Sequence, residues 1–436
     1  MEHLNWLWLP FVPGILVLAH VASKEKSDRF RQFTLSVLLA TSTAWVALSA
    51  VTAWRNSVAP REFDFQLYWI YGSTIYDGHS PYDVDALKRA AEPLNPGADM
   101  MAELLFLQTP PSALLYGPLG AFDIRTACVL WYAFQAVVIG CVIRLLSRTF
   151  FPDDGIRGTL LCTTLLLSML PARNTIWLAQ TNFLILLMLL LFWRSSRQMK
   201  GGVALGVGIL IKPILALYPI YLFLTRQWKP FFGVIAAGAV LSLASIAVFG
   251  PDMYFAYFLD NPIAHQMPSA LYSEGINQSL LATILRILDV EIDSGHPAIM
   301  PTFVILALGL SIVSGWAIRR AGQSDAAMPL SVVLTLSLLL FPKTLSHYSV
   351  LLIVPMLLVW SRRHSSPRGA IQAGGLITAV FALCAADHAF VANLLSWCFV
   401  CGMAFRLKVP TPASDKERTR LTQLAVFSSN PDPLVV

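Results

Sequence analysis

The feature that most constrains this chain is a series of long apolar runs that carry almost no charge. The clearest of them cover Ser36–Ala53, Ala127–Leu145, Gly233–Phe249 and Phe303–Ala317. A helix needs roughly 20 apolar residues to cross the hydrocarbon core of a bilayer, and these runs reach or approach that length. Because backbone groups in lipid must be hydrogen-bonded within their own segment, the runs predict transmembrane α-helices.

The composition excludes an ordinary soluble protein. Only 13% of residues are charged and 56% are hydrophobic, with a mean hydropathy of +0.63. Soluble domains carry about 25% charged residues, which they need for a solvated surface. We therefore expect an all-α polytopic membrane protein with roughly 11–13 transmembrane helices and interfacial helices in the first outer loop.

The basic residues lie between the apolar runs rather than in one patch. This is the positive-inside pattern of a cytoplasmic (inner) membrane protein, and it gives no reason to expect a nucleic-acid partner. The first apolar stretch, Leu4–His20, lacks the basic start and the small-residue cleavage site of a signal peptide. We expect it to remain as a helix, with Lys24–Arg31 inside the cell and the next helix leading outward.

The polar segments suggest how the chain is organised. Residues 1–405 are expected to form one multi-spanning domain, with outer loops at 54–111 and 251–301 and a flexible cytoplasmic tail at 406–436. The first loop mixes acidic and aromatic residues, which suits helices lying in the interface. The short apolar segment Pro110–Ala121 is expected not to cross, because only then do Arg144 and Arg148 fall inside.

Three pairs of short apolar segments are interrupted by a cation. Arg173 lies in the first break, Lys212 in the second, and Lys343 and His347 in the third. Broken helices at membrane depth are tolerated where they line a cavity, and ionisable residues there indicate a functional site. Several cations facing one vestibule would suit a phosphate group. The alternative is that each long side chain simply reaches the interface.

Asp64 is the leading candidate for a catalytic acid or base. It follows the second apolar run and lies among aromatic residues, where partial desolvation would raise the pKa of its carboxyl group. Such a group can act as a general base on a sugar hydroxyl. A solvated loop acid is the competing interpretation. Gln180, Asn182, Asn277 and Gln278 could bond a sugar or, equally, neighbouring helices.

Other motifs point away from cofactor chemistry. Cys398 and Cys401 have C-x-x-C spacing but lie in an apolar run with no second pair, so we interpret them as buried apolar residues. Asp83 and Asp85 have D-x-D spacing but lie well downstream of Asp64. No nucleotide-binding glycine motif is present. We expect neither a metal nor a cofactor.

Together these motifs resemble those of glycosyltransferase family 87, the polyprenol-phosphate-mannose-dependent mannosyltransferases of the GT-C membrane superfamily. The resemblance rests on short motifs that occur in order along most of the chain. They are Asp64-Phe-x-x-Tyr68, Gly78-His-Ser-Pro81-Tyr82, Thr109-Pro110-Pro111 with Pro118-Leu119, Gln180-Thr-Asn182, Ile211-Lys212-Pro213, Asn277-Gln278-Ser279, and Pro342-Lys343 followed by His347-Tyr348.

The resemblance implies a GT-C fold and an inverting transferase that uses a polyprenyl-phosphate sugar, typically mannose, as donor. Asp64 would be the catalytic base. Two further sets of residues would bind the substrates. The donor phosphate would be bound by Lys212, Lys343, His347 and Arg173. The sugar or acceptor would be contacted by Tyr68, Gln180, Asn182, Asn277, Gln278 and Tyr348. The chain departs from the family in having Ala179 where Gly usually precedes Gln, and in an extra first helix.

Two alternatives stay open. The first is a ligase or polymerase acting on lipid-diphosphate-linked oligosaccharides, which a cation-lined outer vestibule also fits. The second is a glycolipid transporter, since broken helices with buried cations occur there too. For the transferase we expect a glycolipid or glycan acceptor, membrane lipids as further partners, a monomeric state, and a site facing the periplasm or exterior.

Overall fold

The computed structural model describes residues 11–24, 27–58, 63–94, 109–259, 275–292, 296–322, 325–363 and 367–407. Within these ranges the chain is almost entirely helical, and an isolated antiparallel bridge between Asn277 and Leu345 takes the place of any strand. The expected all-α class is therefore confirmed. The tail beyond 407 and parts of both outer loops lie outside the described residues.

Within the described ranges, six helices are long and apolar enough to cross a membrane, and a bent pair supplies a seventh. The pair, α9 and α10, bends by 71° because Met169 is extended and Pro171 follows it in the first turn of α10. The long helices are α3 (Asp28–Val58), α8 (Ile124–Phe150), α14 (Trp228–Phe249), α18 (Ile299–Ala321), α21 (Pro367–Ala385) and α22 (Ala389–Arg406), and the pair is α9 (Gly155–Ser168) with α10 (Leu170–Trp177).

Shorter apolar helices complete the bundle. They are α2 (Phe11–Lys24), α11 (Asn182–Arg194), α12 (Met199–Ile211), α13 (Leu217–Leu224), α19 (Ala327–Leu340) and α20 (Ile353–Ser361), with the 3₁₀ turns η4 (Pro213–Leu215) and η6 (Ser346–Leu352) before α13 and α20. Two expected breaks are found, at Lys212 and at Pro342. The third expected break, around Arg173, differs from the prediction. Arg173 lies inside α10, and breaks come before and after this helix, at Met169 and after Trp177.

Burial separates the helices into a core and a lipid-facing shell. The α19 helix and the η6–α20 segment are buried along nearly their whole length, so they form the centre. By contrast, α18 exposes Ile305, Leu308, Ile312 and Trp316, and α14 exposes Val240 and its neighbours. An exposed apolar face on a helix long enough to span is stable only against lipid. The outer helices therefore face the bilayer.

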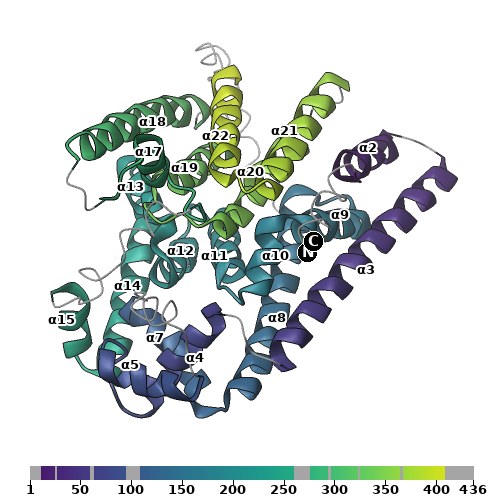
Figure 1. Cartoon of the computed structure of the whole chain (residues 1–436). Coiled ribbons are helices and arrows are strands. Elements are labelled where there is room, and N and C mark those ends of the chain that lie inside the picture. Colours follow the sequence, from purple (N-terminus) through teal and green to yellow (C-terminus); the bar gives the residue numbers. More distant parts are fainter. Residues whose placement is uncertain are drawn as a thin grey trace, which may run out of the picture.

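Short helices cover one end of the bundle, at the lower side of Figure 1. They are α4 (Phe63–Tyr76), α5 (Val84–Ala91), η1 (Glu92–Leu94), η2 (Pro110–Ser112), α7 (Ala113–Tyr116), η3 (Gly117–Ala121) and α15 (Asp252–Phe258). As expected, the segment 110–121 does not span but forms three short turns. A further short helix, α17 (Leu280–Leu288), packs against α18 through Leu281, Leu285 and Ile299.

Glycines set the closest backbone contacts. A Cβ atom at Gly120 would overlap the backbone of Gly72, so α4 can lie directly on η3 only because both residues are glycine. In the same way, Gly202 and Gly206 on α12 bring its backbone against α14 at Pro230 and Val234. Such small-residue contacts are the usual basis of tight helix packing in membranes. The first contact fixes α4, which carries the leading candidate for the catalytic base.

Candidate functional site

The helix α4 presents Asp64 and Tyr68 one turn apart on the same face. The ring of Tyr68 is buried and stacks on Tyr116 of α7, with 4.4 Å between centroids and 9° between planes. Trp131 of α8 packs against the same pair, 5.6 Å from Tyr68. These three aromatic rings hold the first turns of α4, and the half-buried Asp64 is thereby fixed at the edge of the core.

A sharp turn after α10 places the second group of polar residues. Ala179 takes a left-handed conformation with φ of 55°, and its carbonyl accepts a 2.7 Å hydrogen bond from the indole of Trp131. Gln135 of α8 donates to the carbonyl of Gln180 at 3.3 Å. The hydroxyl of Tyr68 then donates to the side-chain oxygen of Gln180 at 3.0 Å. The turn thus joins α10 to the Asp64 helix.

Lys212 supplies a buried cation to this group. It ends α12 in an extended conformation, φ −147° and ψ 123°, as expected for a residue before proline. Its ammonium donates to Oε1 of Gln180 and to Oδ1 of Asn182, the latter at 3.2 Å. The same ammonium lies 4.5 Å from the ring centroid of Tyr348. Lys212 is buried, with only 8% of its surface exposed, but its ammonium has both hydrogen-bond and cation–π partners.

The loop that carries Lys343 and His347 is held from outside. Asn277 Nδ2 donates to the carbonyl of Pro342 at 3.1 Å, and the backbone N–H of Gln278 donates to Thr344 at 2.6 Å. Gln278 also accepts a bond from the backbone of Phe390 on α22. Asn277 and Gln278 are therefore positioned as braces of this loop rather than as members of the polar cluster.

Electrostatics couple the carboxylate to the cations. Burial raises the pKa of Asp64 above its usual value, against the opposing effects of a hydrogen bond from Gln180 and the positive charges of Lys212 and Lys343. His347 is 2% exposed and interacts with the charge of Lys212. Its Nε2 finds no hydrogen-bond partner among the residues that the structure describes. An acid, two lysines and a histidine therefore converge from three segments: α4, the end of α12 and the segment that runs from the end of α19 into η6.

Arg173 on α10 faces Trp45 and the cavity next to this cluster. Its guanidinium stands 5.2 Å from the ring of Trp45 on α3 and lines a cavity of about 650 Å³. This cavity lies between α3 and α10 and reaches Ser346, the residue before His347. Its lining is mixed, with Asn174 and Asp387 beside apolar side chains of both helices. The described residues thus bury the Lys212 cluster itself, and the open space lies next to it.

The structure also shows what the sequence motifs left out. Tyr116 and Trp131, which pack against Tyr68, were not singled out, although both lie in or beside apolar segments whose role was open. Thr175 accepts a 3.1 Å hydrogen bond from Asn182, a contact that no spacing rule would reveal. Asp83 caps α5 through bonds from two backbone N–H groups, which gives it a structural role. Among the described residues, no group of three His, Cys, Asp or Glu could hold a metal.

Comparison with known proteins identifies the class of chain that this site belongs to. The family model described as glycosyltransferase family 87 matches residues 106–342, a little over half of the chain. The chain belongs to glycosyltransferase family 87. The resemblance inferred from the motifs is therefore confirmed at the level of the family. The match includes Gln180, Asn182 and Lys212 but ends before Lys343 and begins after Asp64.

Two curated relatives are similar over part of their length. Both are named alpha-(1->3)-arabinofuranosyltransferase and come from two strains of Mycobacterium tuberculosis, CDC 1551 / Oshkosh and ATCC 25618 / H37Rv. Each is 27% identical over 159 residues, which cover 34% of this chain and 36% of the relative. The chain thus spans about a third of the curated relatives it matches. No solved structure matches it significantly. Its apolar helices and its family match together make this glycosyltransferase of family 87 a multi-pass membrane protein.

Proposed function

We propose that the protein is an inverting glycosyltransferase that moves mannose from a polyprenyl-phosphate donor to a hydroxyl of a glycolipid or glycan. The observation that carries the proposal is the cluster in which Tyr68, one turn from Asp64 on α4, and the ammonium of Lys212 both donate to the side chain of Gln180. A base for the acceptor and cations for the leaving phosphate are thus within one cluster. We propose that this cluster lies on the outer face of the cytoplasmic membrane, which the positive-inside pattern supports.

The chemistry needs one base and one anion site. Asp64 would take the proton of the acceptor hydroxyl while the oxygen of that hydroxyl forms a bond to the anomeric carbon of the donor sugar. The bond between that carbon and the phosphate oxygen breaks, and the polyprenyl phosphate leaves with the electron pair. Lys212 and Lys343 would stabilise the negative charge as it develops. Attack opposite the leaving group inverts the anomeric configuration.

The adjacent cavity suits a lipid-linked donor. Apolar residues of α3 and α10, such as Leu48 and Leu170, would contact the polyprenyl chain, while Arg173 and Asn174 could bond polar groups. A cavity of about 650 Å³ is in the range of ordinary ligand sites. Since it extends to Ser346, a donor bound there would bring its phosphate toward His347 and Lys343. Tyr68, Gln180, Asn182 and Tyr348 would then surround the sugar.

Arabinofuranose is the second candidate for the sugar. The curated relatives carry arabinofuranosyltransferase activity in their names, and the similarity extends over about a third of this chain. Mannose is favoured by the resemblance of the motifs, along most of the chain, to those of the mannosyltransferases of this family. Both proposals share the same base, the same phosphate site and the same leaving group.

The test is a donor comparison with the full-length protein in liposomes. We expect product from polyprenyl-phosphate mannose and none from a diphosphate-linked oligosaccharide. Product from polyprenyl-phosphate arabinofuranose alone would replace mannose by the second candidate. Use of the diphosphate-linked oligosaccharide would indicate a ligase, and glycolipid movement across the bilayer without product would indicate a transporter.

A further inference from the structure

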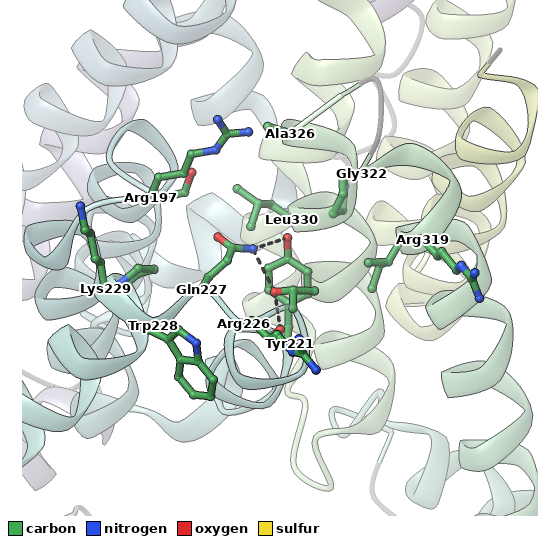
Figure 2. Close-up of a pocket in the computed structure, with 15 residues that line it drawn as sticks. Arg197, Tyr221, Arg226, Gln227, Trp228, Lys229, Arg319, Gly322, Ala326 and Leu330 are labelled. Atoms are coloured by element: carbon green, nitrogen blue, oxygen red, sulfur yellow. Dashed lines mark hydrogen bonds between the residues drawn. The ribbon is translucent and has the colours of Figure 1, made fainter. Parts of the chain in front are cut away.

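A second cavity lies at the other end of the bundle from Asp64. It has a volume of about 680 Å³ and lies between the α11–α12 loop, the α13–α14 turn, the last turn of α18 and the start of α19 (Figure 2). Helix α12 begins at this cavity with Met199 and ends at Ile211, directly before Lys212. Thirteen residues of helix rise about 20 Å. The cavity is therefore distinct from the candidate active site.

Cations surround this cavity. Arg197, Arg226, Lys229 and Arg319 contribute to its wall, and none of the described residues that line it is acidic. Figure 2 shows Arg197 extending along the upper edge, with Lys229 and Arg319 pointing outward at the two sides. The acid nearest to the lining in sequence, Asp325, forms an ion pair with Arg362 and caps α19. The described lining residues consequently provide no anion to balance these charges.

The turn that carries Arg226 has a strained backbone. Arg226 has a φ of 55°, the left-handed region that side chains with a Cβ atom disfavour. Hydrogen bonds hold this turn. Gln227 Nε2 donates to the hydroxyl of Tyr221 and to that of Thr225, both at 3.0 Å (dashed lines in Figure 2). Glycine would fit the turn without strain, so the presence of arginine calls for a reason other than backbone geometry.

The surroundings match the depth of a lipid headgroup. Trp228 at the start of α14 is exposed and packs edge-on against Phe223, 5.6 Å between centroids. Exposed tryptophan at the end of an apolar helix is typical of the membrane–water interface. The floor of the cavity is apolar, with Pro329 and Leu330 buried. Cations above an apolar floor match a phosphate that is attached to acyl chains.

We propose that this cavity binds the phosphate headgroup of an anionic membrane lipid, separately from the sugar donor. Arg197 and Arg226 would pair with the phosphate oxygens, since guanidinium groups bind phosphate through paired hydrogen bonds. Lys229 and Arg319 would add attraction from the rim. Acyl chains would follow the exposed apolar faces of α13 and α14. The bound lipid would connect the starts of α12, α14 and α19, which continue toward the candidate active site.

The test measures lipid binding to the full-length protein by native mass spectrometry, with phosphatidylglycerol and phosphatidylcholine as probes. We expect phosphatidylglycerol to be retained in preference to phosphatidylcholine. Arg226→Gly should weaken this retention roughly fivefold, and Arg197→Gln with Arg226→Gly about thirtyfold, from a contribution of about 1 kcal/mol for each cation near an anionic lipid. Thermal stability of Arg226→Gly should stay equal or rise, because glycine relieves the strained turn.

The matched control is Arg144→Gln with Arg148→Gln. Both arginines are exposed on α8 near its last turns, and this double variant removes the same charge outside the cavity. We expect it to retain phosphatidylglycerol as the wild type does. An equal loss in the control would reduce the effect to general surface charge and overturn the proposal. Full competition by inorganic phosphate at equal concentration would overturn the lipid assignment in favour of a soluble anion.

Discussion

The ammonium of Lys212 and the hydroxyl of Tyr68 both donate hydrogen bonds to the side-chain oxygen of Gln180. One glutamine thus connects the helix that carries Asp64 with a cation at the end of α12. The geometry keeps opposite charges close without a direct ion pair. That separation leaves each charged group available to a different part of a bound donor and acceptor.

Replacing the base should abolish transfer. We expect Asp64→Asn to lower kcat by about 10²–10⁴, the usual contribution of a general base, while the protein still folds. The measurement is product formation from polyprenyl-phosphate mannose together with a thermal melt. Asp77→Asn is the matched control, because Asp77 directly follows the last residue of α4 and its side chain is exposed. Wild-type rates in Asp64→Asn would rule out this residue as the base.

The pH dependence should report the environment of Asp64. Burial raises the pKa of its carboxyl group above 3.8, so the group holds its proton to a higher pH than a free aspartate. Because a base must be deprotonated, kcat/KM should fall as the pH falls through this raised pKa. We expect the acid limb of the profile above pH 3.8. A flat profile down to that pH would show that no such group controls the rate.

Removing Lys343 should affect the donor before the acceptor. In Lys343→Met we expect a higher KM for the polyprenyl-phosphate donor, because a cation that attracts the phosphate is lost. The acid limb should also move to higher pH, since Lys343 lowers the pKa of Asp64. Lys200→Met, at the opposite end of α12, is the matched control. An unchanged donor KM with a shifted profile would separate the two roles, and no change in either would remove Lys343 from the site.

The close contact under α4 should be sensitive to a single methyl group. Gly120→Ala would place a Cβ atom into the backbone of Gly72, so we expect a loss of about 1–3 kcal/mol in stability. Gly140→Ala on α8 has open space around its Cβ position and should be neutral or slightly stabilising. Thermal melts in detergent compare the two. Equal melting temperatures would mean that α4 does not lie on η3 in this way.

The turn before Gln180 should be improved by glycine. Ala179 has a φ of 55°, which costs an alanine roughly 1–2 kcal/mol, and Ala179→Gly should recover about 1 kcal/mol of that after its own entropy loss. The same substitution at Ala172, which is buried inside α10, should instead destabilise the protein. Melting temperatures that change in the same direction for both variants would contradict the left-handed turn.

Much of the fold could be predicted because lipid leaves few choices. Runs such as Gly233–Phe249 have one stable conformation in a bilayer. Pro213 and Pro342 each follow the end of a helix by two residues, because a proline cannot continue the hydrogen bonding of that helix. The single break expected around Arg173 is instead two breaks, one at Met169 and one after Trp177. The second depends on Ala179, and a left-handed alanine has no signature in the sequence. The family resemblance then supplied Asp64, which the chemistry of the residues alone left as one of two interpretations.

The sequence by itself determined the solvent, the helical class, the family and the residues able to bear charge inside the bilayer, because these follow from composition, run length and local motifs. The tertiary structure alone decided which of those residues meet. It joined the helix of Asp64 to Lys212 through Tyr68 and Gln180, assigned Asn277 to bracing a loop, and placed Arg173 against Trp45. Contacts between distant segments depend on how whole helices pack, and no local pattern encodes that packing.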